Sequence, residues 1–114
     1  MPPSVEDRFR DVLEAISEIE EALLHVSFEQ FSNSKLLRKA TERNLEIVCE
    51  ASRRFPDLVK QSAPAIDWHK MNDFANLLRH AYHSTKVDIV WDIVQNHLPP
   101  LKSFVEFKMR ASDK

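Results

Sequence analysis

Apolar residues recur every three or four positions along most of this 114-residue chain, and that spacing restricts the fold more than any other feature of the sequence. Side chains at this spacing line one face of an α-helix, whereas a half-buried β-strand needs strict alternation of apolar and polar residues. No stretch shows such alternation together with strand-like composition. The sequence therefore predicts an all-α protein.

Capping residues divide the first half of this pattern into two long helices. Ser4 and Asp7 form a capping pair that begins the first helix, and Ser34 is placed to cap the second, which should end near Phe55. We interpret the segment VSFEQFSNS between the two helices as a short connector whose two phenylalanines pack onto the core.

The second half is divided in the same way. Asp67 is placed to cap a third helix that extends through Tyr82, and Thr85 with Asp88 begins a fourth. The prolines at 99 and 100 are predicted to end the fourth helix, and the second of them can open a fifth. We expect a single domain, residues 1–114, folded as an antiparallel bundle of four main helices plus a short fifth.

Composition excludes several classes of function. The chain has no glycine, so glycine-rich phosphate loops and dinucleotide fingerprints are absent. Its formal net charge of -2 gives no molecule-wide basic field, so contact with RNA would have to be local.

The single cysteine, Cys49, lies in an apolar helical pattern and is expected to be buried and inert. With no signal-peptide pattern and no apolar run of about 18 residues, we expect a cytoplasmic protein without a membrane partner.

A line of polar residues on the third helix is the strongest candidate site. Asn72, Asn76, Arg79, His80 and His83 lie opposite the apolar stripe of that helix. Histidine changes charge near neutral pH, and arginine presents a planar fork that matches a phosphate. This pair suits RNA cleavage by 2′-hydroxyl attack, in which the histidine moves the proton and the arginine holds the phosphate.

Two other interpretations of this line remain open. Adjacent residues point about 100° apart on a helix, so Arg79 and His80 of one chain do not converge simply on one atom, and a second chain could supply the missing partner. The first alternative is that these polar residues are only a solvated helix face with incidental histidines. A metal site at Asn76, His80 and His83, with Asp73 as a further ligand, is disfavoured because no second helix carries a matching carboxylate and histidine pattern. We therefore predict neither metal nor cofactor.

The chain as a whole resembles the HepT-like proteins, the toxins of MNT and HepT toxin-antitoxin pairs within the HEPN superfamily. The resemblance covers nearly the full length and rests on four stretches: RFRDVLEAISEIE, ATERNLEIVCEASRRFP, IDWHKMNDFANLLRHAYH and VDIVWDIVQNHLPPL. It implies a helical bundle, usually homodimeric. It also implies a metal-independent ribonuclease in which two copies of a motif, Arg followed by four to six residues and His, meet across the dimer.

The resemblance assigns roles to individual residues. The motif histidine falls on His80, and the polar residue that commonly follows the motif arginine falls on Asn76, but Ala75 occupies a position where that arginine is expected. Either Arg79 takes over the phosphate contact, or the chain is a non-catalytic module that docks a nucleotidyltransferase or binds nucleotide or RNA. His80-Ala81-Tyr82 matches the His-x-Tyr motif whose tyrosine receives AMP from the nucleotidyltransferase antitoxin, although Tyr82 also continues the apolar stripe.

Overall fold

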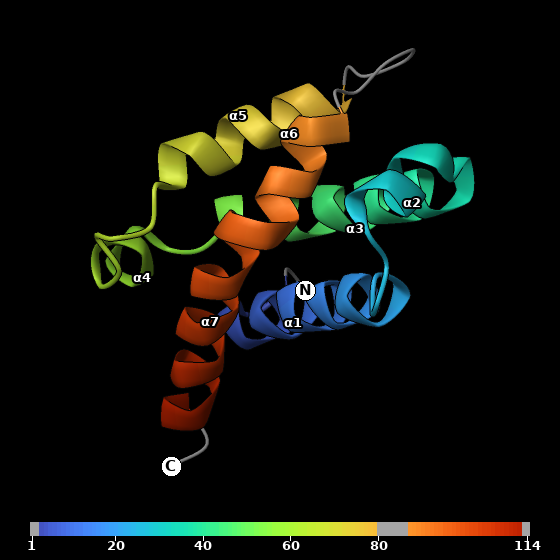
Figure 1. The fold of residues 1–114 in the computed structure, drawn as a ribbon. Coiled ribbons are helices and arrows are strands. Elements are labelled where there is room, and N and C mark those ends of the chain that lie inside the picture. Colours follow the sequence, from blue (N-terminus) through green and yellow to red (C-terminus); the bar gives the residue numbers. More distant parts are fainter. Residues whose placement is uncertain (1–2, 80–86, 113–114) are drawn as a thin grey trace.

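The computed structural model describes residues 3–79 and 87–112, and every regular element in these ranges is helical (Figure 1). The all-α prediction is therefore confirmed for the described residues. In chain order the elements are α1 (Val5–Ala22), α2 (Phe28–Asn33), α3 (Lys35–Arg53), α4 (Asp57–Gln61), α5 (Trp68–Arg79), α6 (Val87–Asp92), a π-helical segment η1 (Ile93–His97) and α7 (Leu98–Ser112).

The predicted caps of the two long N-terminal helices are present. The Asp7 backbone N–H donates to Ser4 Oγ at 3.1 Å, and the Ser4 N–H donates to Asp7 Oδ2 at 3.1 Å, which completes a capping box at the start of α1. At the start of α3 the Leu37 N–H donates to Ser34 Oγ at 3.2 Å. Each cap satisfies an amide that the first helical turn leaves unpaired.

The segment interpreted as a connector contains a helix of its own. Ser27 and Gln30 form a second capping box that begins α2, with hydrogen bonds of 3.1 and 2.9 Å. Phe31 on α2 is fully buried, and its ring lies 5.3 Å from that of Trp91 on α6. The expected packing of this segment onto the core is thus confirmed for Phe31, whereas Phe28 remains 42% exposed.

The prediction that Pro99 and Pro100 end a helix is wrong. α6, η1 and α7 follow one another without a break, so the chain is helical from residue 87 to 112, and the fifth helix is not short. A proline ring clashes with the carbonyl four residues earlier and removes one amide donor. In η1, directly before the prolines, the Leu98 N–H donates to the Ile93 carbonyl, which is the wider π spacing. We attribute the tolerance of the prolines to this wider turn, which redirects the carbonyls facing their rings.

The arrangement of the long helices puts one end of α5 beside α3. α1, α3 and α5 run in alternating directions, α3 packs against both of the others, and the α6 to α7 rod crosses them steeply (Figure 1). Buried apolar side chains of α1, α3, α5 and the α6 to α7 rod contribute to the core: Phe9, Val12, Ile16, Ile19, Leu45, Val48, Met71, Phe74, Leu78, Val90, Ile93, Leu101 and Val105. Within residues 3–79 and 87–112, no helix has both the length and the apolar character needed to cross a membrane.

Candidate functional site on helix α5

Helix α5 has one buried and one exposed face, which places the predicted polar line at the surface. Its start is capped by Asp67, whose Oδ1 accepts the Lys70 N–H at 3.0 Å. The side chains packed into the core are those of Met71, Phe74, Ala75 and Leu78. Asn72, Asn76 and Arg79 are exposed.

The other predicted site residues follow directly after α5. Arg79 is the last residue of the helix, and His80, Tyr82 and His83 lie outside the described residues. The structure therefore brings Asn72, Asn76 and Arg79 onto one surface that leads to His80 in the chain. Ala75, at the position where the resemblance calls for an arginine, is only 3% exposed.

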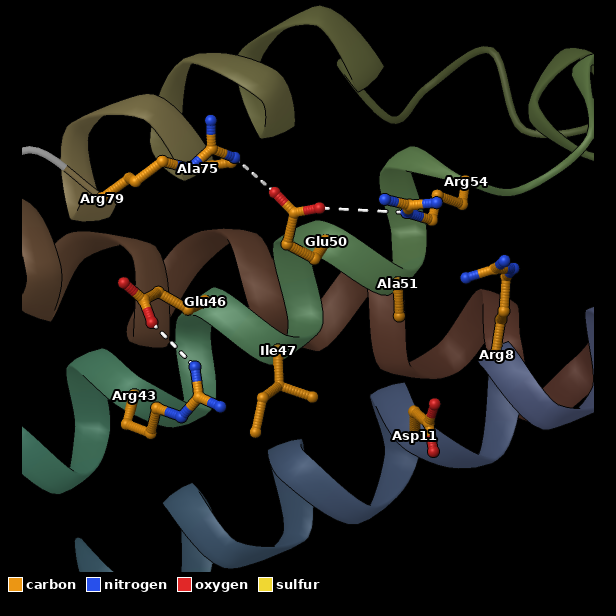
Figure 2. Close-up of a pocket in the computed structure, with 10 residues that line it drawn as sticks. All are labelled: Arg8, Asp11, Arg43, Glu46, Ile47, Glu50, Ala51, Arg54, Ala75 and Arg79. Carbon is orange, nitrogen blue, oxygen red and sulfur yellow. Dashed lines mark hydrogen bonds and ion pairs between the residues drawn. The ribbon is translucent and has the colours of Figure 1, made fainter. Parts of the chain in front are cut away.

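A carboxylate on α3 fixes the side chain of Arg79. Arg79 Nη2 donates a hydrogen bond to Glu50 Oε1 (Figure 2). Two further guanidinium groups approach the same carboxylate: Arg53 Nη1 lies 3.6 Å from Oε1, and Arg54 Nε lies 3.9 Å from Oε2. Glu50 thus joins the end of α3 to the end of α5 and holds Arg79 in a defined direction, whereas an exposed arginine without a partner samples many rotamers.

Sequence reasoning missed this role of Glu50. Helical spacing within one helix indicates only ion pairs between neighbouring residues, and the pair between Arg43 and Glu46, 3.0 Å apart, is of that kind. The Glu50 to Arg79 contact joins residues 29 positions apart in the chain. Only the packing of α3 against α5 brings them together.

Two hollows flank Arg79. The first, which we call the three-helix groove, has a volume of about 450 Å³ and lies between α1, α3 and α5; Figure 2 labels its lining residues, among them Arg8, Arg43, Glu50, Arg54, Ala75 and Arg79. The second, the α5 hollow, has a volume of about 430 Å³ and is lined by Arg53, His69, Asn72, Asp73, Asn76 and Arg79. Arg79 is therefore accessible from both sides.

Cys49, on α3, is a poor nucleophile. Burial raises the pKa of the Cys49 thiol to about 12, and the neighbouring Glu50 and Glu46 carboxylates act in the same direction, so the thiolate needed for nucleophilic attack is scarce. In the part of the chain that the structure describes, no three His, Cys, Asp or Glu side chains cluster closely enough to hold a metal ion. The arrangement offers guanidinium and amide donors, which suit a phosphate or a sugar.

Comparison with known proteins assigns the chain to a family. The model of the HepT-like ribonucleases matches residues 12–107. The chain belongs to the HepT-like ribonuclease family. The match spans the helices from the middle of α1 to most of α7, so it includes the greater part of both hollows and the α5 end.

Individual relatives of this HepT-like chain agree with the family match. It is 37% identical over 106 residues to a Thermococcus cleftensis protein named "Probable ribonuclease HepT", covering 93% of this chain and 96% of that one. It is 32% identical over 96 residues to the Methanocaldococcus jannaschii protein named "Putative RNase MJ1380", covering 84% of this chain and 88% of the relative. No solved structure matches the chain significantly.

Proposed function

We propose that this HepT-like protein is the toxin of a toxin-antitoxin pair, a homodimeric and metal-independent endoribonuclease that a nucleotidyltransferase antitoxin inactivates by attaching AMP to Tyr82. The observation that carries the proposal is the position of Arg79. Its guanidinium is held by Glu50 at the end of α5, between two hollows, and the next residue in the chain is His80. The family membership supports RNA as the substrate class.

The proposed reaction uses the RNA 2′-hydroxyl as the nucleophile. His80 accepts the hydroxyl proton while the 2′-oxygen forms a bond to the adjacent phosphorus and the bond from phosphorus to the 5′-oxygen breaks. The leaving 5′-oxygen takes up a proton, so the products are a 2′,3′-cyclic phosphate and a 5′-hydroxyl. Arg79 stabilises the negative charge that builds up on the phosphate oxygens. A guanidinium has five N–H donors, so the bond to Glu50 leaves others for the phosphate.

A second copy of the chain completes the proposed site. Arg79 and His80 are adjacent, and adjacent side chains leave a helix about 100° apart. The α5 ends of two protomers, placed next to each other, would present the arginine of one chain and the histidine of the other to the same phosphate. Asn76, exposed on α5, is assigned to the catalytic group with Arg79 and His80, and Asn72 and His83 are assigned supporting roles.

Arg79→Ala is expected to lower the rate of RNA cleavage by about 100-fold, because the variant lacks preorganised donors to the transition state. The measurement is cleavage of single-stranded RNA by purified protein in the presence of EDTA, with the 2′,3′-cyclic ends identified by mass spectrometry. Arg110→Ala serves as the control, since this arginine lies in the last turn of α7. Equal rates for the two variants would contradict the assignment of Arg79.

Tyr82→Phe is expected to abolish modification by the antitoxin, because only the phenol oxygen of Tyr82 can accept the adenylyl group in the His80-Ala81-Tyr82 motif. The measurement is the intact mass of the chain after co-expression with its nucleotidyltransferase. The unsubstituted chain should gain one adenylyl group and lose cleavage activity, and the variant should keep both its mass and its activity. An unmodified wild-type chain beside an active partner enzyme would contradict this part of the proposal.

A second candidate function is favoured by Ala75. This residue lines the three-helix groove and is only 3% exposed, in a position where the family resemblance calls for an arginine. A chain that lacks this arginine can serve as a non-catalytic module that docks the nucleotidyltransferase or binds nucleotide or RNA. Stable partner binding by unmodified protein, with no RNA cleavage at high protein concentration, would favour this candidate over the ribonuclease.

A further inference from the structure

The three-helix groove continues away from Arg79 to a second pair of arginines. Arg8, near the start of α1, and Arg54, directly after α3, line the same end of the groove (Figure 2). They come from two different parts of the chain. Arg79 lines the groove at its α5 side, and Glu50 lies between Arg79 and Arg54.

These two arginines have more unused donors than the others in the groove. Arg43 is paired with Glu46 at 3.0 Å, and Arg79 is paired with Glu50. Arg54 approaches Glu50 only through Nε, at 3.9 Å, and its side chain is 59% exposed. Among the described residues, no hydrogen bond or ion pair engages the side chain of Arg8, which is half-buried. Free guanidinium N–H groups therefore gather at this end of the groove, beside the Asp11 carboxylate, which also lines it (Figure 2).

The shape of the groove suits an extended chain molecule better than a compact anion. Ala51 and Ala75 line the groove with short side chains, and Ile47 adds an apolar surface; Figure 2 shows Ala51 and Ile47 pointing from α3 toward α1. The hollow of about 450 Å³ reaches from Arg79 to the pair of Arg8 and Arg54. Phosphate groups separated by sugars would meet guanidinium groups at both ends, and the sugars between them would face the short and apolar side chains.

We infer that Arg8 and Arg54 form a second phosphate-binding site for single-stranded RNA, which holds a backbone phosphate next to the one that Arg79 contacts. The inference rests on the proposed function in one respect, namely that RNA is the ligand of this face. Four arginines and three carboxylates, those of Asp11, Glu46 and Glu50, line the groove, so it carries a local excess of positive charge on a chain whose net charge is -2. Arg8 and Arg54 are binding residues here, and they do not take part in bond breaking.

The test measures binding separately from cleavage. Each of Arg8→Gln and Arg54→Gln is introduced into full-length protein that also carries His80→Ala, so that the RNA stays intact, and a fluorescein-labelled single-stranded RNA is titrated at several KCl concentrations. Each variant should bind about tenfold more weakly. The slope of log Kd against log salt should fall by about 0.7 for each RNA phosphate that the variant no longer neutralises.

Arg10→Gln is the matched control, since Arg10 is on α1, is exposed, pairs with Asp7 at 2.8 Å and does not line the groove. Arg8→Lys and Arg54→Lys provide variants that keep the charge, and they should retain most of the salt slope. Circular dichroism melting of every variant establishes that the fold is intact.

The outcomes separate this inference from the proposed function. If the unsubstituted protein cleaves RNA but Arg8→Gln and Arg54→Gln match Arg10→Gln in both Kd and slope, the second phosphate site is overturned and the ribonuclease stands. If the protein binds RNA through Arg8 and Arg54 without cleaving it, the site is supported and the ribonuclease fails. Absence of RNA binding, or binding of free AMP as tight as that of the RNA, overturns the site.

Discussion

His80→Ala is expected to lower RNA cleavage by about 10²- to 10⁴-fold, the usual contribution of a general acid or base. Without the imidazole, water would have to remove the proton from the 2′-hydroxyl, while Glu50 would still hold Arg79, the proposed phosphate ligand, in place. Binding of RNA should therefore change little, and the decrease should appear in kcat. Single-turnover cleavage together with RNA titration measures the two quantities separately.

The control for this variant is another histidine outside the site. His25 lies between α1 and α2 with a left-handed backbone, φ 62°, so His25→Asn is chosen because asparagine tolerates that conformation. It should cleave RNA at the wild-type rate. Unchanged cleavage by His80→Ala would remove His80 from the mechanism.

Mixing inactive variants tests the second copy of the chain. If the arginine and histidine at one phosphate come from different protomers, an exchanged mixture of Arg79→Ala and His80→Ala dimers contains heterodimers with one intact site. Such a mixture should recover up to about a quarter of the wild-type activity, from half of the dimers with one of two sites each. If subunit exchange is verified and cleavage activity still does not recover, the arginine and the histidine at one phosphate come from the same chain.

The fold followed from the sequence where helix signals are local. Spacing and capping residues predicted α1, α3 and α5, and the caps at Ser4, Ser34 and Asp67 are present in the structure. The prolines at 99 and 100 misled the prediction, because a proline signals a helix end only if the backbone cannot adjust before it. The π turn of η1 is such an adjustment, and buried residues on both sides of the prolines, Ile93 and Leu101, hold the rod against the core.

The candidate site was predictable only in part, for a related reason. The exposed line of Asn72, Asn76 and Arg79 follows from helical periodicity, since α5 alone determines it. The partner of Arg79 cannot be predicted from periodicity, because Glu50 lies on another helix and its contact depends on how α3 packs against α5. The groove is hidden from sequence analysis for the same reason, since its lining comes from three helices.

Phe31→Ala is expected to lower the free energy of unfolding by about 3–5 kcal/mol, the usual cost of removing a buried phenylalanine. The Phe31 side chain has no exposed surface and contacts Trp91 on α6 at a ring distance of 5.3 Å. Without it a cavity would remain between α2 and the long rod, because the surrounding helices relax only partly. Urea denaturation followed by circular dichroism measures the change.

Phe28→Ala is the matched comparison, because both phenylalanines lie on α2 and both contact Trp91. The Phe28 ring is 5.7 Å from Trp91, but the residue is 42% exposed, so its removal should cost only about 1 kcal/mol, mostly from the aromatic pair. A clear difference between the two variants would establish that α2 stabilises the fold by covering α6, the helix that directly follows residues 80–86. Equal effects would mean that α2 contributes only its surface contact with Trp91, and its assignment to the core would then be wrong.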